Sequence, residues 1–236
     1  MPVSRSPSPE NNVFGMSDTI VPDREHKQAG TSTYDFGGLL SSPLRLHEDL
    51  KEGCGGQLWP AGMVLAKYML TPHDYNVSDK HMIEIGAGGG LVGLAVAAGC
   101  SLRHQLLITD QEPMYALMMK NIQLNDLSGR VDARIYDWGS QPKPTFSTTS
   151  GHPDVVLAAD CVYFEPAFPL LLQSLQDFIG PDTRCYFCFK KRRKADMRFI
   201  KDMKKTFVVE EVEYKERDAD RRESIFLYLL TLKSAR

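Results

Sequence analysis

Short apolar runs alternate with longer amphipathic segments over much of this chain, from residue 82 to residue 206. The runs have the length of buried strands, and the segments between them repeat apolar residues at helical spacing. Because strands that alternate with helices are joined by right-handed crossovers, the pattern predicts a parallel sheet with helices on both faces. The expected strands are 82–85, 105–109, 131–136, 154–159 and 185–189, and the expected helices are 91–98, 113–125, 168–179 and 195–206.

The C-terminal part of the chain departs from this alternation. Segments 207–214 and 224–233 both have the pattern of strands, and a short charged stretch joins them, in which we expect a turn and no helix. Two strands joined in this way pair antiparallel. The expected fold class is α/β: a Rossmann-like, seven-stranded, mostly parallel sheet with helices on both faces and an antiparallel C-terminal hairpin.

The N-terminal part divides into two regions. Residues 1–30 are rich in Pro, Ser and charge, a composition that buries too little apolar surface to offset the entropy of ordering, so we expect a disordered tail. Residues 31–56 predict a short β extension that ends in a flexible glycine joint at 53–56. A helix is expected from Pro60 to about Leu70. Residues 31–236 are predicted to form a single domain.

Composition excludes several classes of protein. A formal net charge of −2 gives no global basic field for general nucleic-acid binding. The apolar runs are far shorter than the ~20 residues of a membrane span, and the polar N-terminus does not resemble a signal peptide. Five cysteines, an odd number, fit a reducing compartment. Cys185 and Cys188 have CxxC spacing, but such positions on a strand face opposite sides of the sheet, so we interpret them as core residues and predict no metal site.

The loop after the first expected strand of the sheet gives the clearest chemical signal. Gly86, Gly88 and Gly90 come directly before an apolar helix, so the backbone can approach a ligand closely and offer free N–H groups. Counted from the first glycine the spacing is GxGxG, and Leu91 stands where a dinucleotide GxGxxG needs its third glycine. Because GxGxxG can still be matched from Gly88, NAD remains an alternative cofactor.

Acidic residues end three further expected strands, at the edge where ligands of open parallel sheets bind. Asp110 stands 24 positions after Gly86, as an acceptor for two ribose hydroxyls would, a role that NAD and S-adenosylmethionine sites share. Asp137 and Trp138 are placed to bind an adenine amine and cover its ring, although the tryptophan can equally plug the sheet edge. Glu84, inside a buried strand, needs a partner among the backbone donors of the glycine loop or in the first helix, and we interpret it as structural support.

The order of these motifs resembles a known family. Over roughly residues 31–233 the chain is similar to the seven-β-strand protein lysine methyltransferases of the methyltransferase-like 21 type, whose members modify translation elongation factors and chaperones. The motifs that carry this likeness are Trp59-Pro60, the loop from Glu84 to Gly90, Asp110, Asp137-Trp138 and Asp160-Cys-Val-Tyr163. Segments 34–38 and 190–196 look most like the fungal branch that acts on elongation factor one-alpha.

The resemblance implies a cofactor and a site. S-adenosyl-L-methionine would be the cofactor, and Asp160 and Tyr163 would be catalytic residues that line the lysine channel. The cofactor contacts implied by the resemblance are Trp59, Gly86, Ala87, Gly88, Asp110, Trp138 and Ala159.

Methyl transfer to lysine requires the neutral amine, whereas free lysine, with a pKa of ~10.4, is almost fully protonated at neutral pH. A carboxylate nearby favours the charged form of lysine. We therefore expect Asp160 to capture and orient the amine and to stabilise the charge that moves from sulfur to nitrogen. Tyr163 is expected to hydrogen-bond the amine or to face it with its ring.

The basic run at 190–194 is either a solvated helix start or a docking site for an acidic protein surface. Nucleic acid is not expected as substrate, because adenine methyltransferases favour Asn/Asp-Pro-Pro-aromatic where this chain has Asp160-Cys-Val-Tyr163. We predict a cytoplasmic, monomeric S-adenosyl-L-methionine-dependent protein-lysine N-methyltransferase acting on elongation factor one-alpha, with no direct nucleic-acid or membrane partner. The alternatives are a non-catalytic cofactor-binding module, a small-molecule methyltransferase and an NAD-dependent oxidoreductase.

Overall fold

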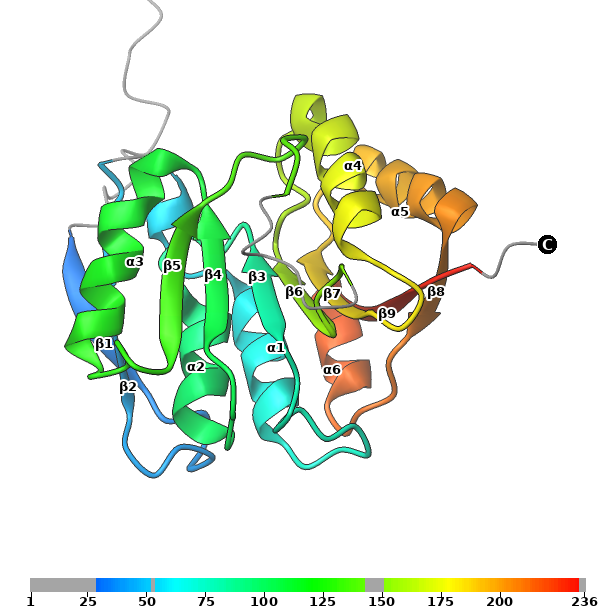
Figure 1. Ribbon diagram of the computed structural model, residues 1–236. Helices are drawn as coiled ribbons and strands as arrows, with labels where there is room; N and C mark the ends of the chain where they lie inside the picture. The colour runs from blue at the N-terminus through cyan, green and yellow to red at the C-terminus, as the bar shows by residue number, and fades with distance from the viewer. Residues whose placement is uncertain (1–28, 52–53, 143–150, 234–236) are drawn as a thin grey trace, which may run out of the picture.

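A seven-stranded sheet with the strand order β5-β4-β3-β6-β7-β9-β8 forms the centre of the computed structural model, which describes residues 29–51, 54–142 and 151–233 (Figure 1). Strands β3 to β7 pair in parallel, whereas β9 is antiparallel to both of its neighbours. This confirms the expected fold class. The strands are β3 (Met82–Ile85), β4 (Leu106–Asp110), β5 (Val131–Ile135), β6 (Val155–Ala159), β7 (Arg184–Lys190), β8 (Phe207–Glu211) and β9 (Ile225–Leu232).

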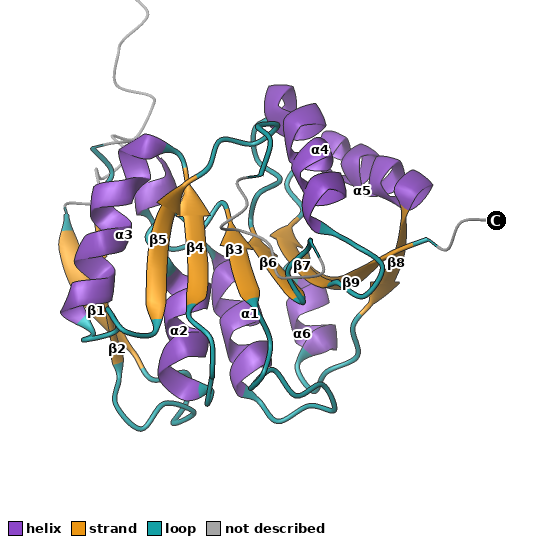
Figure 2. Ribbon diagram, in the orientation of Figure 1, coloured by secondary structure: helices purple, strands orange, loops and turns teal. Residues whose placement is uncertain are grey.

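Helices cover both faces of this sheet (Figure 2). One apolar core forms against α1 (Pro60–Leu70), α2 (Leu91–Gly99) and α3 (Glu112–Leu124), and the other against α4 (Phe168–Phe178) and α5 (Lys194–Thr206). In α5 the buried residues Ala195, Phe199, Ile200 and Met203 recur at helical spacing, which explains why the pattern predicted this helix. Cys185 packs in the second core and Cys188 in the first, so the two thiols lie on opposite faces, as expected.

The N-terminal extension is an antiparallel pair of β1 (Gly30–Tyr34) and β2 (Leu44–Glu48), as predicted. Leu44 and Leu46 are buried in the first core, and β2 packs against α3 and α2. Apart from residues 29 and 30, the expected tail lies outside the described residues. In the parts of the chain that the structure covers, no helix is both long and apolar enough to cross a membrane.

The expectation of a flexible joint at 53–56 is wrong for residues 54–56. They form a short 3-10 helix, Cys54–Gly56, packed against its surroundings. A Cβ added to Gly56 would lie 1.6 Å from the carbonyl oxygen of Asp49, and one added to Gly55 would lie 2.8 Å from Sδ of Met114. The glycines are therefore needed because the backbone is closely packed here.

The expectation of no helix between the last two strands is also wrong, because α6 (Arg217–Arg222) lies between β8 and β9. Its sequence is entirely polar apart from Ala219, so it has no apolar periodicity to indicate a helix. Polar contacts hold it instead: Arg217 pairs with Glu213 and Asp218, and the Tyr214 hydroxyl donates to Asp220 at 2.9 Å. The predicted antiparallel pairing of the two strands is confirmed.

Candidate active site

A cavity of about 470 Å³ opens at the carboxyl ends of β3, β4 and β6. It lies where the chain leaves β3 toward one edge of the sheet and β6 toward the other, the position at which ligands bind in open α/β sheets. The structure brings to this cavity all nine residues that the resemblance implies as catalytic or cofactor-binding. They are Trp59, Gly86, Ala87, Gly88, Asp110, Trp138, Ala159, Asp160 and Tyr163.

The glycine loop between β3 and α2 has a backbone that side chains rarely tolerate. Gly86, Gly88 and Gly90 have φ angles of +63°, +55° and +88°. A Cβ on Gly88 would lie 2.4 Å from the carbonyl oxygen of Gly55, and one on Gly86 would lie 2.8 Å from Cζ2 of Trp138. The loop therefore presents bare backbone to the cavity, with the 3-10 helix on one side and the indole on the other.

Asp110 is fixed against this loop. Its Oδ2 accepts a hydrogen bond from the Gly88 N–H at 2.7 Å, and its Oδ1 accepts one from the Gln111 N–H at 2.7 Å. Burial raises the pKa of this carboxyl, and the two N–H donors oppose that rise. Since each carboxylate oxygen has two acceptor positions, Asp110 keeps capacity for hydroxyl donors in the cavity.

Glu84 is buried behind the loop and supports the helix that follows it. Its Oε2 accepts a hydrogen bond from the Gly93 N–H of α2 at 2.7 Å, a partner of the kind that the sequence predicted. Burial raises the pKa of Glu84 to about 8. The side chain thus ties β3 to α2 and holds the loop between them.

Asp137 and Trp138, which follow Tyr136 beyond the end of β5, differ in their relation to the cavity. Trp138 lines the cavity beside Gly86, in the position expected for a cofactor ring contact. Asp137 is exposed and is not among the residues that line the cavity, so the structure does not support its predicted contact with an adenine amine.

Apolar residues that the sequence reasoning missed complete the walls. Met114 at the start of α3 and Leu170 at the start of α4 line the cavity, and Phe164 stands at its mouth with 56% of its surface exposed. Tyr163, 47% exposed, lies beside it. Met114 and Leu170 stand near the starts of helices that follow strand ends, a position that could have indicated a cavity wall. A helical apolar pattern alone does not distinguish residues of a cavity wall from residues of the core.

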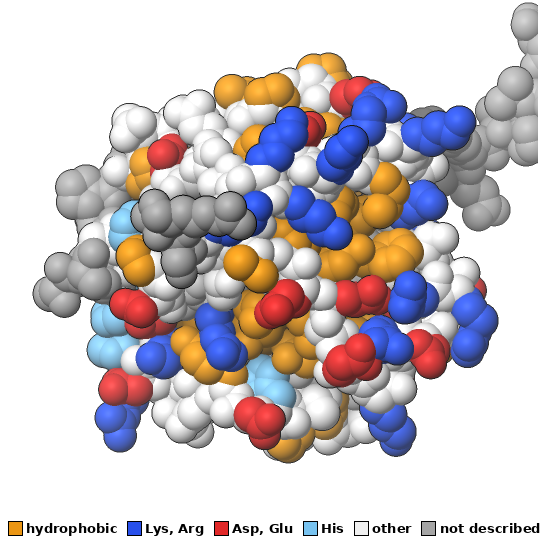
Figure 3. Space-filling view, turned by 90° about the vertical axis from the view of Figure 1, so that its right-hand side faces the viewer, with side chains coloured by type: hydrophobic (Ala, Val, Ile, Leu, Met, Phe, Trp, Pro, Cys, Tyr) orange, Lys and Arg blue, Asp and Glu red, His pale blue; other side chains and the backbone are white. Residues whose placement is uncertain are grey.

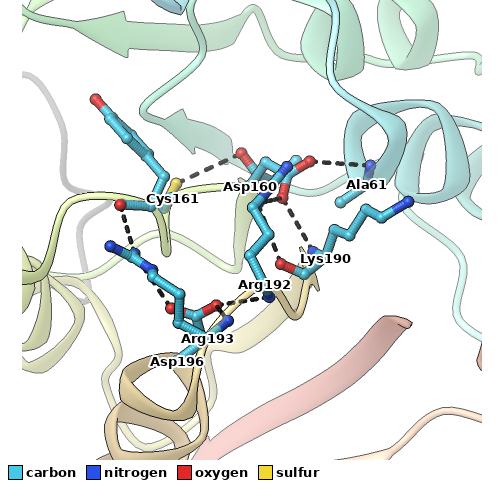
Figure 4. A network of polar contacts seen from close by, with 9 residues as sticks. Ala61, Asp160, Cys161, Lys190, Arg192, Arg193 and Asp196 are labelled. Atoms are coloured by element: carbon cyan, nitrogen blue, oxygen red, sulfur yellow. Dashed lines mark hydrogen bonds and ion pairs between the residues drawn. The ribbon is translucent and has the colours of Figure 1, made fainter. Parts of the chain in front are cut away.

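Asp160 connects three elements, as Figure 4 shows. Its Oδ2 accepts a hydrogen bond from the Ala61 N–H in the first turn of α1 at 3.1 Å, and its Oδ1 accepts one from the Lys190 N–H at the end of β7 at 3.0 Å. The guanidinium of Arg192 pairs with Oδ1 at 2.9 Å. Trp59, the N-cap of α1, makes no capping side-chain hydrogen bond. Asp160, from a distant part of the sequence, instead accepts a hydrogen bond from an N–H group at that helix start.

Two arginines of the basic run at 190–194 contact the Asp160–Tyr163 segment. Besides Arg192, Arg193 donates through Nη2 to the carbonyl oxygen of Tyr163 and pairs with Asp196 at 3.2 Å. Asp196, fully buried, accepts the backbone N–H groups of both arginines, at 2.7 and 2.8 Å. These contacts join the loop after β7 to the Asp160–Tyr163 segment (Figure 4).

Comparison with known proteins places this geometry in context. Residues 39–206 match a protein family described as lysine methyltransferase. The chain is 37% identical over 225 residues to protein-lysine N-methyltransferase EFM6 of Saccharomyces cerevisiae, covering 86% of this chain and 91% of that protein. It is 34% identical to protein N-lysine methyltransferase METTL21A of Danio rerio, covering 75% of this chain and 79% of that protein.

The fold is similar to solved methyltransferase structures. Fibrillarin from Aeropyrum pernix, solved with natively bound S-adenosyl-L-methionine, superposes with a TM-score of 0.51 at 13% identity over 71% of this chain and 73% of that chain. An O-methyltransferase family protein from Burkholderia thailandensis gives a TM-score of 0.51 at 14% identity, over 75% and 56% of the two chains. At such identities the likeness shows the fold alone.

Proposed function

The chain belongs to the lysine methyltransferase family, and on that premise we propose that its substrate is a translation elongation factor, elongation factor one-alpha. The family assignment makes it a protein-lysine N-methyltransferase with S-adenosyl-L-methionine as its cofactor. The observation that carries the assignment of the site is the meeting of all nine predicted residues at one cavity with aromatic residues at its mouth.

The residues of the cavity fit the cofactor. The glycine loop is a cradle that a Cβ would fill, because one on Gly88 would lie 2.4 Å from Gly55. Asp110 offers buried acceptor oxygens for ribose hydroxyls, and Trp138 and Met114 offer an apolar wall for a ring. Trp59 and Ala159 stand on the side nearer Asp160. We assign these residues to cofactor binding.

S-adenosyl-L-methionine supplies a methyl group on a positively charged sulfur, which a neutral amine attacks. Residues of this chain orient that amine and line the channel through which it enters. Tyr163 lines the cavity with 47% of its surface exposed, and we assign its side chain to contact with the lysine stem and amine. Asp160 lies behind it with a side chain only 3% exposed, and it is placed to accept a hydrogen bond from the amine and to stabilise the positive charge that develops on nitrogen.

The narrower substrate rests on two likenesses. Segments 34–38 and 190–196 resemble the fungal branch that acts on elongation factor one-alpha. The similarity to the yeast protein extends over 86% of this chain, compared with 75% for METTL21A of zebrafish, which fits the likeness to the fungal branch. A cytoplasmic monomer fits such a substrate, since cytosolic elongation factors work in that compartment.

A strip of cations beside the mouth supports a protein substrate with an acidic surface. We call Lys191, Lys194, Lys201 and Lys204 the α5 basic strip; all four are exposed. Figure 3 shows Lys and Arg side chains gathered over the upper part of the face where α5 lies. Arg198 of the same helix pairs with Glu165, next to Phe164 at the mouth, at 2.7 Å. We propose that this strip docks the substrate.

A lysate from a strain that lacks the protein tests the substrate assignment. The lysate is incubated with purified protein and tritium-labelled S-adenosyl-L-methionine, and labelled proteins are identified by mass spectrometry. We expect the label on a lysine of elongation factor one-alpha. Label on a different protein contradicts the narrower proposal, and label on small molecules alone supports a small-molecule methyltransferase.

A further inference from the structure

Arg192 places a cation beside Asp160. Its Nη1 lies 2.9 Å from Oδ1 of Asp160, and its guanidinium carbon lies 5.1 Å from the ring centre of Trp59. Nη1 also donates to the carbonyl oxygen of Lys190 at 3.1 Å, and the backbone N–H of Arg192 donates to Asp196. Contacts on several sides therefore hold the guanidinium between the carboxylate and the indole.

The other charges around Asp160 have different partners. On β7, the Lys190 ammonium is directed to Glu223, at 4.0 Å, and only its backbone N–H reaches Asp160. In the loop after β7, Arg193 pairs with Asp196. The first turn of α1 contributes the Ala61 N–H and no charge. Cys161 follows Asp160, and burial raises the pKa of its thiol, so it stays neutral. From β3 and β4, Glu84 and Asp110 line the same cavity and are held by backbone N–H groups.

This arrangement bears on the protonation of the substrate. An unpaired carboxylate near a lysine favours the ammonium form, which cannot attack a methyl group. A carboxylate already paired with a guanidinium exerts much less of that effect, because the opposite charges largely cancel at the amine. Oδ1 takes both the Lys190 N–H and Arg192, whereas Oδ2 takes the Ala61 N–H and has a second acceptor position for an amine N–H.

We propose that Arg192 is a positioning residue for methyl transfer: by pairing with Asp160 it cancels the carboxylate charge at the acceptor end of the cavity, so that the substrate lysine is held there as the neutral amine. The inference rests on the proposed function, since it requires a lysine substrate at Asp160. It narrows the expected role of Asp160: the paired carboxylate orients the amine, and it no longer acts as an uncompensated charge that stabilises the positive charge developing on nitrogen. Arg192 acts through Asp160 and need not touch the substrate.

The test is the pH dependence of kcat, which reports ionisations in the enzyme–substrate complex. Wild type, Arg192→Gln, Arg192→Lys and Asp160→Asn are assayed with saturating elongation factor one-alpha and cofactor from about pH 7 to about pH 10, up to the ordinary lysine pKa. Arg198→Gln, which removes an exposed arginine paired with Glu165, is the matched control. Thermal melting and titration with S-adenosylhomocysteine accompany each variant, and we expect Arg192→Gln to bind that ligand as wild type does.

We expect Arg192→Gln to displace the rising limb of the profile to higher pH by about 1 unit or more, the effect of one uncompensated charge close to an amine. Its rate then falls about tenfold near pH 8 and recovers toward wild type at high pH. In Arg192→Lys, which keeps the charge, the rising limb should stay at the wild-type pH. The same is expected for the Arg198→Gln control. Asp160→Asn, which leaves Arg192 unpaired, should move the limb to lower pH.

A limb that stays in place in folded Arg192→Gln overturns the inference and leaves Arg192 as a structural clamp, whatever the loss of rate. If Arg192→Gln does not fold, the double variant Asp160→Asn with Arg192→Gln takes its place, and a limb at the same pH as in Asp160→Asn alone overturns the inference. If wild type transfers no methyl group to elongation factor one-alpha or to any lysate protein, the proposed function fails and the inference falls with it. Activity of wild type with unmoved profiles in the variants refutes the inference alone.

Discussion

The N–H of Gly88 donates a hydrogen bond to Oδ2 of Asp110 at 2.7 Å. This bond joins the glycine loop after β3 to the acid that ends β4, so the proposed ribose acceptor and the proposed cradle are one unit. The shape of the loop and the direction of the carboxylate therefore depend on each other.

We expect Asp110→Ala to lower the affinity for S-adenosylhomocysteine by ~10-fold to ~100-fold, because two ribose hydroxyls lose a charged acceptor worth ~1.5–3 kcal/mol. Isothermal titration calorimetry measures the affinity. Asp137→Ala is the matched control, since this neighbouring carboxylate is exposed and does not line the cavity, and it should bind nearly as wild type does. Unchanged affinity in folded Asp110→Ala removes Asp110 from the cofactor site.

Gly93→Ala should destabilise the protein, although alanine normally favours a helix. A Cβ at Gly93 would lie 2.4 Å from Cγ2 of Ile108 and 2.8 Å from Oε2 of Glu84, so α2 must move away from the sheet. We expect a loss of ~1–3 kcal/mol in the free energy of unfolding, measured by denaturant titration. Gly129→Ala, with nothing within 4 Å of the added Cβ, is the control and should be close to neutral. Equal stability of the two variants contradicts the packing described for α2.

Glu84 predicts a pH dependence of stability. Burial raises its pKa from 4.5 to about 8 in the folded protein. Between these values the folded state holds a proton that the unfolded state has lost, so the contribution of Glu84 falls as pH rises through this window and levels off above it. Glu84→Gln keeps an acceptor oxygen for the Gly93 N–H and has no proton to lose. Relative to this variant, the free energy of unfolding of wild type should fall by about a few kcal/mol between about pH 4.5 and about pH 8. A difference in the free energy of unfolding between wild type and Glu84→Gln that stays constant across this pH window contradicts the raised pKa of Glu84.

The α5 basic strip predicts a defect in KM. Reversing the charge of Lys201 and Lys204 should raise KM for the protein substrate about tenfold and leave kcat unchanged, since exposed ion pairs contribute up to ~1 kcal/mol each. The same double reversal at Lys120 and Lys215, which lie outside the strip, is the control. The difference in KM should shrink as salt is added. A loss in kcat, or an equal effect in the control, argues against docking on this strip.

The sheet and the position of its cavity were predictable because both follow from patterns among residues that are close together in the sequence. Apolar runs marked the parallel strands, and since the carboxyl ends of such strands meet at one edge, Gly86, Asp110 and Asp160 were expected together. The cavity brings them together. Helix α6 and the packed turn at 54–56 were missed because neither has an apolar period. Polar contacts hold α6, and the turn depends on glycines pressed against distant backbone.

The contacts that the two arginines make with the Asp160–Tyr163 segment were also not predictable from the sequence. Arg192 and Arg193 stand in a run of five basic residues in which nothing local separates them from solvated lysines. Their partner Asp196 is nearby in the sequence, but Asp160 comes from the end of another strand, 32 positions away from Arg192. The pairing thus depends on β6 and β7 lying side by side, a feature of the folded chain.

The most direct test of the central claim is mass spectrometry of elongation factor one-alpha after incubation with the purified full chain and S-adenosyl-L-methionine. We predict methyl groups on the side-chain nitrogen of a single lysine, no transfer when that lysine is replaced by arginine, and strongly reduced transfer by Asp110→Ala. Binding of S-adenosylhomocysteine by the same preparation shows that the cofactor site is intact. Cofactor binding without methylation of any lysine, in the elongation factor or in lysate proteins, would contradict the account.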